Sequence, residues 1–257
     1  MLGEIGRVVA LGASNLTRGF QTVVSTARRT WGPNVEVLAA LGHGRSYGAP
    51  SRLIVRTLPG ILQSDLWYQL SSLPPAVTRG LVTDVGNDIL YGFSATQTLA
   101  WAEEAVDRLQ QFTKDVVLTD LPLVSIRRLS NARFLLFRSV LVPQCRLSLA
   151  QAVDATERVN YGLASLAAAR GLRFFQLKPQ WYGFDPIHIR PLLWRSAWQE
   201  ILCGEAGEPR EARGPAPWLE AWRLYFMRPE RQWLFGLEQV SPQAGVALPM
   251  GGRVWLY

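Results

Sequence analysis

Histidine is scarce in this chain, and the scarcity narrows the search for acid–base chemistry. The 257 residues include only two histidines, His43 and His188. A serine hydroxyl is a weak nucleophile at neutral pH and needs a neighbouring imidazole to accept its proton. His188 follows Asp185 by three residues, and a carboxylate beside an imidazole can hold the ring in the useful tautomer. This pair predicts the general base of a nucleophilic site.

A candidate nucleophile and two sets of hydrogen-bond donors lie upstream. The apolar segment Val8–Leu11 leads into Gly12-Ala13-Ser14, which is typical of a strand that ends in a Gly-x-Ser turn. Gly42–Ser46 and Val85–Asp88 form two further turns that we expect at strand ends. Each turn alone has an ordinary explanation, because serine, asparagine and aspartate commonly cap helices or occupy turns and glycine often lies in loops.

The order of these residues resembles the SGNH (GDSL-like) hydrolase family, named after its serine, glycine, asparagine and histidine. The resemblance covers roughly the first 200 residues, the length of one α/β domain. It implies a catalytic triad of Ser14, His188 and Asp185. It also implies an oxyanion hole formed by the backbone N–H groups of Ser14 and Gly44 and by the side-chain amide of Asn87. The family's Gly-Asp-Ser-Leu motif is here Gly12-Ala13-Ser14-Asn15, so its aspartate and leucine are missing.

The resemblance implies hydrolysis of carboxylic esters without a cofactor. Ser14 would attack the acyl carbonyl of a small-molecule ester, and water would later release the acyl group. Esterase, acetylesterase, lipase-like and thioesterase activities all fit. Two alternatives stay open: an acyltransferase that uses the same site, and a catalytically inactive binding protein of SGNH fold.

Four side chains next to the motifs are candidates for binding substrate. His43 precedes Gly44 but has no aspartate nearby to orient it, so we expect it at the edge of the site and not as the base. Arg45, Tyr91 and Trp181 also neighbour the motif turns, although each can equally well pack inside the fold or face solvent.

Composition excludes several classes of protein. The net charge is +7, but the basic residues occur singly or in pairs without a long run, so we expect no nucleic-acid partner. A moderately cationic surface can still favour anionic substrates by steering. Cys145 and Cys203 lack the spacing of a metal site or a disulfide framework. No apolar stretch approaches the roughly 20 residues that span a bilayer, and the N-terminal apolar run is too short for a signal peptide. We therefore expect a cytoplasmic protein.

Apolar runs alternate with helical patterns along most of the chain, which predicts an α/β fold of three layers with a five-stranded parallel sheet, flavodoxin-like in architecture. The predicted strands are Arg7–Leu11, Val35–Ala40, Gly80–Val85, Asp115–Thr119 and Leu172–Gln176. Helices are predicted over Thr98–Phe112 and Ala150–Arg170, with Gly171 ending the second and Pro191 opening the last helix of the domain. Ligands bind beyond the carboxyl ends of such strands, where all four motif turns are expected.

The composition changes near Cys203. Residues 1–204 are predicted to form the hydrolase domain and residues 205–257 a C-terminal extension that begins with a Gly- and Pro-rich linker. In the extension, Trp218, Trp222 and Tyr225 are spaced to share one face of a short helix. Val246–Pro249 and Arg253–Tyr257 are predicted to pair as a hairpin through Gly251-Gly252. An extension this small must pack on the main domain or on another subunit, which allows a homo-oligomer.

Overall fold

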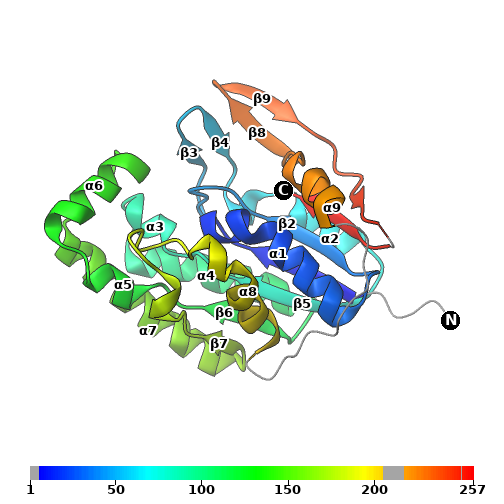
Figure 1. The fold of residues 1–257 in the computed structure, drawn as a ribbon, viewed down its shortest axis with the longest axis horizontal. Coiled ribbons are helices and arrows are strands. Elements are labelled where there is room, and N and C mark those ends of the chain that lie inside the picture. The colour runs from blue at the N-terminus through cyan, green and yellow to red at the C-terminus, as the bar shows by residue number, and fades with distance from the viewer. Residues whose placement is uncertain (1–5, 205–216, 250) are drawn as a thin grey trace.

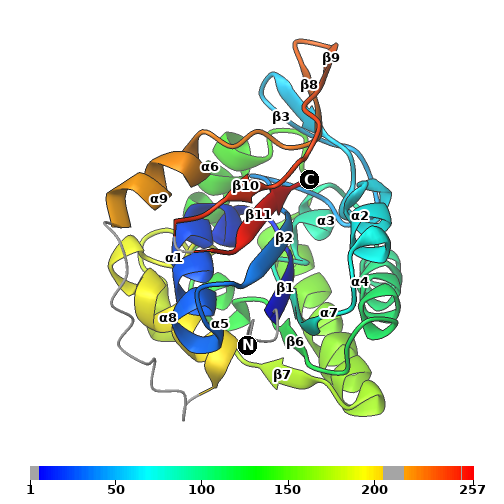
Figure 2. The same cartoon turned by 90° about the vertical axis from the view of Figure 1, so that its right-hand side faces the viewer.

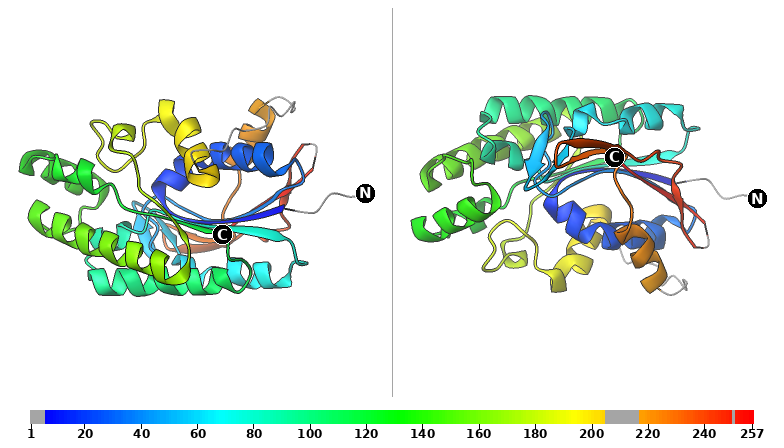
Figure 3. Two further views of the ribbon diagram at one scale, coloured as in Figure 1. Left: turned by 90° about the horizontal axis from the view of Figure 1, so that it is seen from below. Right: turned by 90° about the horizontal axis from the view of Figure 1, so that it is seen from above.

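The computed structural model describes residues 6–204, 217–249 and 251–257, which form a central sheet covered by helices on both faces (Figures 1 and 3). All five predicted strands are present, and the α/β class is confirmed. They are β1 (Gly6–Leu11), β2 (Glu36–Ala40), β5 (Val77–Val82), β6 (Val116–Thr119) and β7 (Arg173–Phe175). Neighbouring strands among these five pair in parallel.

The main sheet has seven strands instead of the predicted five, in the order β10-β11-β2-β1-β5-β6-β7. The added strands come from the C-terminal extension: β11 (Arg253–Leu256) pairs in parallel with β2, and β10 (Val246–Ala247) pairs antiparallel with β11. Figure 2 shows these two strands beside β2. The side chains of β11 alternate between the two faces of the sheet and enter both apolar cores, with Val254 in one and Trp255 in the other. The extension thereby covers an edge of β2 that would otherwise be open.

Two helical layers enclose the sheet (Figure 3). Buried side chains of α1 (Ser14–Trp31), α8 (Trp194–Cys203) and α9 (Pro217–Tyr225) pack on one face. Those of α2 (Leu66–Ser72), α4 (Ala95–Gln110) and α7 (Leu149–Arg170) pack on the other. The predictions of α4 and α7 are confirmed, and Gly171 ends α7 with a left-handed φ of 64°. Pro191 instead begins a 3₁₀ turn, Pro191–Leu193, and α8 starts directly after this turn at Trp194. Proline suits the first turn of either type of helix.

A second sheet of four antiparallel strands was not predicted. It joins β3 (Ser51–Leu53) and β4 (Arg56–Leu58) to β8 (Arg231–Leu234) and β9 (Leu237–Val240). In Figure 1 these strands project together from the main body. Its two hairpins turn at Ile54 and at Phe235-Gly236, and Ile54 and Phe235 both have positive φ. Because such turns normally carry Asn-Gly or Gly-Gly, the sequence offers no recognisable hairpin signal there.

Shorter elements complete the chain. They are the helices α3 (Asn87–Leu90), α5 (Leu123–Arg127) and α6 (Asn131–Leu141), and the 3₁₀ turns Ile61–Gln63 and Pro179–Trp181. Helices α5 and α6 follow β6 and form a wall beyond the carboxyl end of the sheet (Figure 1).

The boundary predicted at residues 204/205 begins a linker whose residues 205–216 lie outside the described part of the chain, so the division into two domains stays a prediction. The predicted short helix is α9, but the side chain of Trp218 also lies outside what is described. Leu224 of α9 is buried, whereas Trp222 and Tyr225 are exposed. No helix among the described residues is long and apolar enough to cross a bilayer.

Candidate active site

The motif turns converge at the carboxyl edge of the parallel strands, as the fold requires. Ser14 begins α1 directly after β1, and Asn87 begins α3 after β5. Gly44 lies in the turn after β2, and His188 lies in the long loop that follows β7. The sheet therefore brings together residues that are up to 174 positions apart in the chain.

Ser14, His188 and Asp185 form a hydrogen-bonded row, which we call the Ser–His–Asp row. His188 Nε2 lies 2.9 Å from Ser14 Oγ, and His188 Nδ1 lies 2.6 Å from Asp185 Oδ2. The hydroxyl and the imidazole are both buried, while the Asp185 carboxylate is partly exposed. In the tautomer with a proton on Nδ1, Nε2 is free to accept the serine proton.

The Asp185 carboxylate is held in its ionised form. Burial alone would raise the pKa of Asp185, but the hydrogen bond to His188 and the charge of that imidazole lower it, aided by the backbone N–H groups of Ile187 and His188. The net result is a pKa below the usual range. A carboxylate that stays charged can orient the imidazole and stabilise it after it gains a proton.

Asp84 is a site residue that the sequence analysis missed. The backbone N–H groups of Ala13, Asn15 and Leu16 donate to Asp84 Oδ2 over 3.0, 2.9 and 3.1 Å. Asp84 thus satisfies the N–H groups of Asn15 and Leu16 in the first turn of α1 and leaves that of Ser14 free, and neither Ser14 nor Asn15 caps the helix with its side chain. Because of this, the Ser14 hydroxyl is available to His188. The sequence signal was the position of this aspartate, one residue before the Val85–Asp88 turn. In the structure Asp84 has a positive φ of 59°, which aspartate tolerates better than most residues.

Asn15 links the serine turn to the histidine loop. Its Nδ2 donates to Asp84 Oδ1 over 2.8 Å and to the Ile187 carbonyl over 2.9 Å. Its Oδ1 accepts from the backbone N–H of Ile189 over 2.8 Å. The Asn15 side-chain amide is therefore hydrogen-bonded to the backbone on both sides of His188. A leucine, the residue that the resembled motif carries here, can make none of these bonds.

Two of the three predicted oxyanion donors have no hydrogen-bond acceptor in the part of the chain that the structure describes. Across residues 6–204, 217–249 and 251–257, the backbone N–H groups of Ser14 and Gly44 make no hydrogen bond. Asn87 Nδ2 donates to the Arg45 carbonyl over 3.2 Å, which leaves its second amide hydrogen available. Gly44 has a φ of 67°, and a Cβ there would lie 2.8 Å from Tyr91 Oη, so a glycine is needed at this position. Tyr91 Oη donates to the Gly44 carbonyl over 2.5 Å and steadies the turn.

The remaining sequence candidates lie in different surroundings. Arg45 is fully buried and donates to the carbonyls of Leu41, Pro59 and Tyr257, which is the packing role that the sequence left open. Trp181 is buried and stacks on Phe175 with ring centroids 5.7 Å apart. His43 is half-buried and lines a cavity beside the site. Burial lowers the pKa of His43, and the positive charges of Arg18 and Arg56 lower it further.

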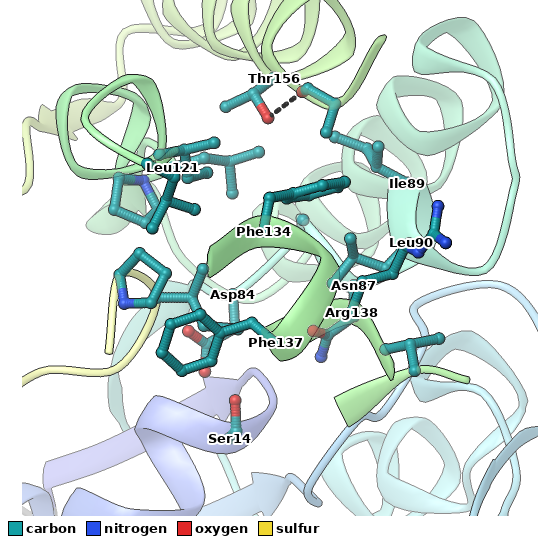
Figure 4. Close-up of a pocket in the computed structure, with 18 of the residues that line it drawn as sticks. Ser14, Asp84, Asn87, Ile89, Leu90, Leu121, Phe134, Phe137, Arg138 and Thr156 are labelled. Atoms are coloured by element: carbon teal, nitrogen blue, oxygen red, sulfur yellow. Dashed lines mark hydrogen bonds between the residues drawn. The ribbon is translucent and has the colours of Figure 1, made fainter. Parts of the chain in front are cut away.

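An apolar cavity of about 100 Å³ opens at Ser14. Figure 4 shows Phe134 and Phe137 extending into it from α6, with Ser14 and Asn87 also on its wall. Most of its other lining residues are aliphatic, among them Ile89, Leu90, Leu121, Ile126, Leu129 and Val142. The cavity can therefore accept an apolar chain attached to a carbonyl at Ser14.

In the part of the chain that the structure describes, no three His, Cys, Asp or Glu side chains lie close enough together to bind a metal ion. The arrangement at Ser14 is instead suited to nucleophilic chemistry by side chains alone.

No family model matches the sequence, and no curated protein matches it. Similar solved structures exist at low sequence identity. A carbohydrate acetylesterase family member from Sinorhizobium meliloti is 16% identical, with a TM-score of 0.50 over 76% of this chain and 95% of the other. A member of the lipolytic protein G-D-S-L family from Veillonella parvula is 13% identical, with a TM-score of 0.50 over 76% of this chain and 96% of the other. The order of the motifs and the likeness in architecture agree: the chain has an SGNH (GDSL-like) hydrolase fold.

Proposed function

We propose that the protein is a serine hydrolase of carboxylic esters or thioesters. The observation that carries this proposal is the Ser–His–Asp row, with 2.9 Å between Ser14 Oγ and His188 Nε2 and 2.6 Å between His188 Nδ1 and Asp185 Oδ2. His188 takes the proton of Ser14 as the serine oxygen attacks the acyl carbonyl, and Asp185 stabilises the imidazolium that forms. His188 then gives the proton to the leaving oxygen or sulfur. Water releases the acyl group in a second round of the same chemistry.

The negative charge that develops on the carbonyl oxygen needs donors already in place. The unoccupied backbone N–H groups of Ser14 and Gly44 and the second amide hydrogen of Asn87 supply three. Donors that are oriented before the reaction stabilise the transition state without having to reorganise, and each is worth about 3 to 4 kcal/mol.

The acyl half of the substrate is apolar in this proposal, because most of the side chains that line the cavity at Ser14 are aliphatic or aromatic. The two similar structures, a carbohydrate acetylesterase family member and a member of the lipolytic protein G-D-S-L family, support ester chemistry for the fold. A cytoplasmic location remains a prediction from the sequence.

A fluorophosphonate probe and p-nitrophenyl esters of acetate, butyrate and octanoate test the proposal. We expect the wild-type protein to be labelled at Ser14 and to hydrolyse at least one ester, and Ser14→Ala to lose both properties while it remains folded by circular dichroism. Labelling that persists in Ser14→Ala would reject the nucleophile. A wild-type protein that neither reacts with the probe nor cleaves any of these esters, nor acyl thioesters, would reject the hydrolase.

A further inference from the structure

A second, larger cavity of about 770 Å³ lies on the other side of the first turns of α1. Its walls are α1, the turn after β2, the strand β4 and the helix α9, which packs beside α1. Figures 1 and 2 show α9 next to α1 on this side of the molecule. None of the residues that define the Ser–His–Asp row lines this cavity, so the proposed acyl site does not account for it.

The cavity is cationic. Arg18 and Arg56 supply its positive charge, His43 also lines it, and among its described lining residues none is acidic. Arg56 is half-buried, and in the part of the chain that the structure describes its guanidinium makes no hydrogen bond or ion pair. Burial lowers the pKa of Arg56. A partly desolvated cation without a counter-charge is less stable than one in water, and an anionic ligand offsets part of that cost.

The cavity adjoins the reacting groups. Arg18 Nη1 lies 4.0 Å from Asp185 Oδ2, at the outer end of the Ser–His–Asp row. His43 precedes Gly44, the proposed oxyanion glycine, and the charge of His188 acts on its pKa. A substrate whose acyl chain fills the apolar cavity at Ser14 can therefore extend its other half into the cationic cavity.

We propose that this cavity binds the leaving group of the substrate, and that the leaving group is an alcohol or thiol that carries a phosphate or carboxylate. The inference rests on the proposed function and specifies its substrate class. Arginine suits both anions, because its planar guanidinium donates two parallel hydrogen bonds to their oxygens. Trp222, Tyr225 and Phe226 line the same cavity and expose most of their side chains, which provides an apolar wall for the carbon skeleton of the leaving group.

The reaction balances without a further reactant. The bond from Ser14 Oγ to the acyl carbon forms as the bond from that carbon to the leaving oxygen or sulfur breaks. The proton that His188 took from Ser14 passes to the leaving atom, and water later cleaves the acyl-serine bond. The phosphate or carboxylate takes no part in these steps and keeps its charge.

Three butyrate esters of similar size test the inference: those of 4-hydroxybenzamide, 4-hydroxybenzoate and 4-hydroxyphenyl phosphate. They carry a neutral amide, a carboxylate and a phosphate in the leaving group, so the two anionic esters also show which anion is preferred. We expect the wild-type protein to have a lower KM for at least one anionic ester than for the neutral ester. In Arg56→Met we expect the KM for that ester to rise about tenfold or more, with the neutral ester changed less than twofold. Arg56→Lys should restore part of the preference.

Arg52→Met is the matched control, because Arg52 lies on the same β3–β4 hairpin but not in the cavity. It removes the same charge and should leave the anionic preference intact, which separates binding from long-range steering. Equal activity of the wild-type protein on all three esters, or a preference that survives Arg56→Met, would overturn the inference while the hydrolase proposal stands. Absence of fluorophosphonate labelling together with absence of activity on every ester and thioester would instead reject the hydrolase itself. Activity on the neutral ester shows that each variant is folded.

Discussion

The two halves of the candidate site are held by different means. In the Ser–His–Asp row, the contacts are made by side chains, to one another and to backbone groups, and Asp84 and Asn15 hold the serine turn and the backbone on both sides of His188. In the oxyanion half, two of the three proposed donors are the backbone N–H groups of Ser14 and Gly44, and contacts such as that of Tyr91 with the Gly44 carbonyl fix their directions only indirectly. The first half depends on which side chains are present, whereas the second depends mainly on backbone conformation. Substitutions should therefore affect the two halves to different degrees.

The largest effect should come from the row itself. His188→Ala removes the proposed base, whose imidazole is hydrogen-bonded to Ser14, so we expect kcat to fall by roughly 10⁴-fold or more. His43→Ala changes the only other histidine and should reduce kcat by less than about tenfold, because His43 lines the proposed leaving-group cavity and, among the described residues, makes no hydrogen bond to Ser14. Steady-state kinetics on p-nitrophenyl butyrate measure both. A His188→Ala protein within tenfold of wild type would remove the row from the mechanism.

The oxyanion half should give a smaller effect. Asn87→Ala deletes one of three proposed donors, and we expect kcat to fall by about 10²- to 10³-fold with little change in KM, since the donor acts mainly on the transition state. The assignment of Asn87 as an oxyanion donor would be wrong if KM rose and kcat did not change, because Asn87 would then bind the substrate in its ground state.

Parts of this site and fold were predictable because their signals are local. Apolar runs identified the five parallel strands, and Asp185 and His188 stand three residues apart, so both appear in the sequence as patterns. The contacts of Asp84 with Asn15 span 69 residues and follow no motif. The second sheet depends on positive φ at Ile54 and Phe235, which lie in the turns of its two hairpins and adopt a conformation that such side chains disfavour.

Asn15→Leu tests the bracing of the row. It leaves Asp84 Oδ1, the Ile187 carbonyl and the Ile189 N–H without their partner, so we expect a loss of about 3 kcal/mol in the free energy of unfolding and about a tenfold fall in kcat. Denaturant titration and kinetics on the folded protein measure the two effects. A protein that loses stability but keeps its full kcat would show that Asn15 supports the fold alone and does not position His188.

The smallest effect on activity should come from Asp88, which follows Asn87 in the oxyanion half, because its substitution is expected to change stability and its pH dependence. Burial raises the pKa of Asp88 to about 6, against weaker hydrogen bonds from Ser46 and Tyr47 that lower it. Protonated Asp88 is therefore favoured in the folded state, and its contribution to stability, roughly 3 kcal/mol, is present below pH 4 and lost as the pH rises to about 6. Asp88→Asn should be more stable than wild type at pH 7. Urea titrations of both proteins between pH 4 and 7 measure the difference in the free energy of unfolding.

Asp185 provides the opposite case within the same molecule. Its folded pKa is lowered, so its contribution to stability is present above pH 4 and is lost as the pH falls through the folded pKa. Asp120, whose pKa burial raises to about 7, titrates in wild type and in Asp88→Asn alike and cancels in their difference. That difference should therefore change between about pH 4 and 6 and be constant outside this range. A difference that is constant throughout would mean that Asp88 ionises as it does in the unfolded chain, and that burial does not raise its pKa.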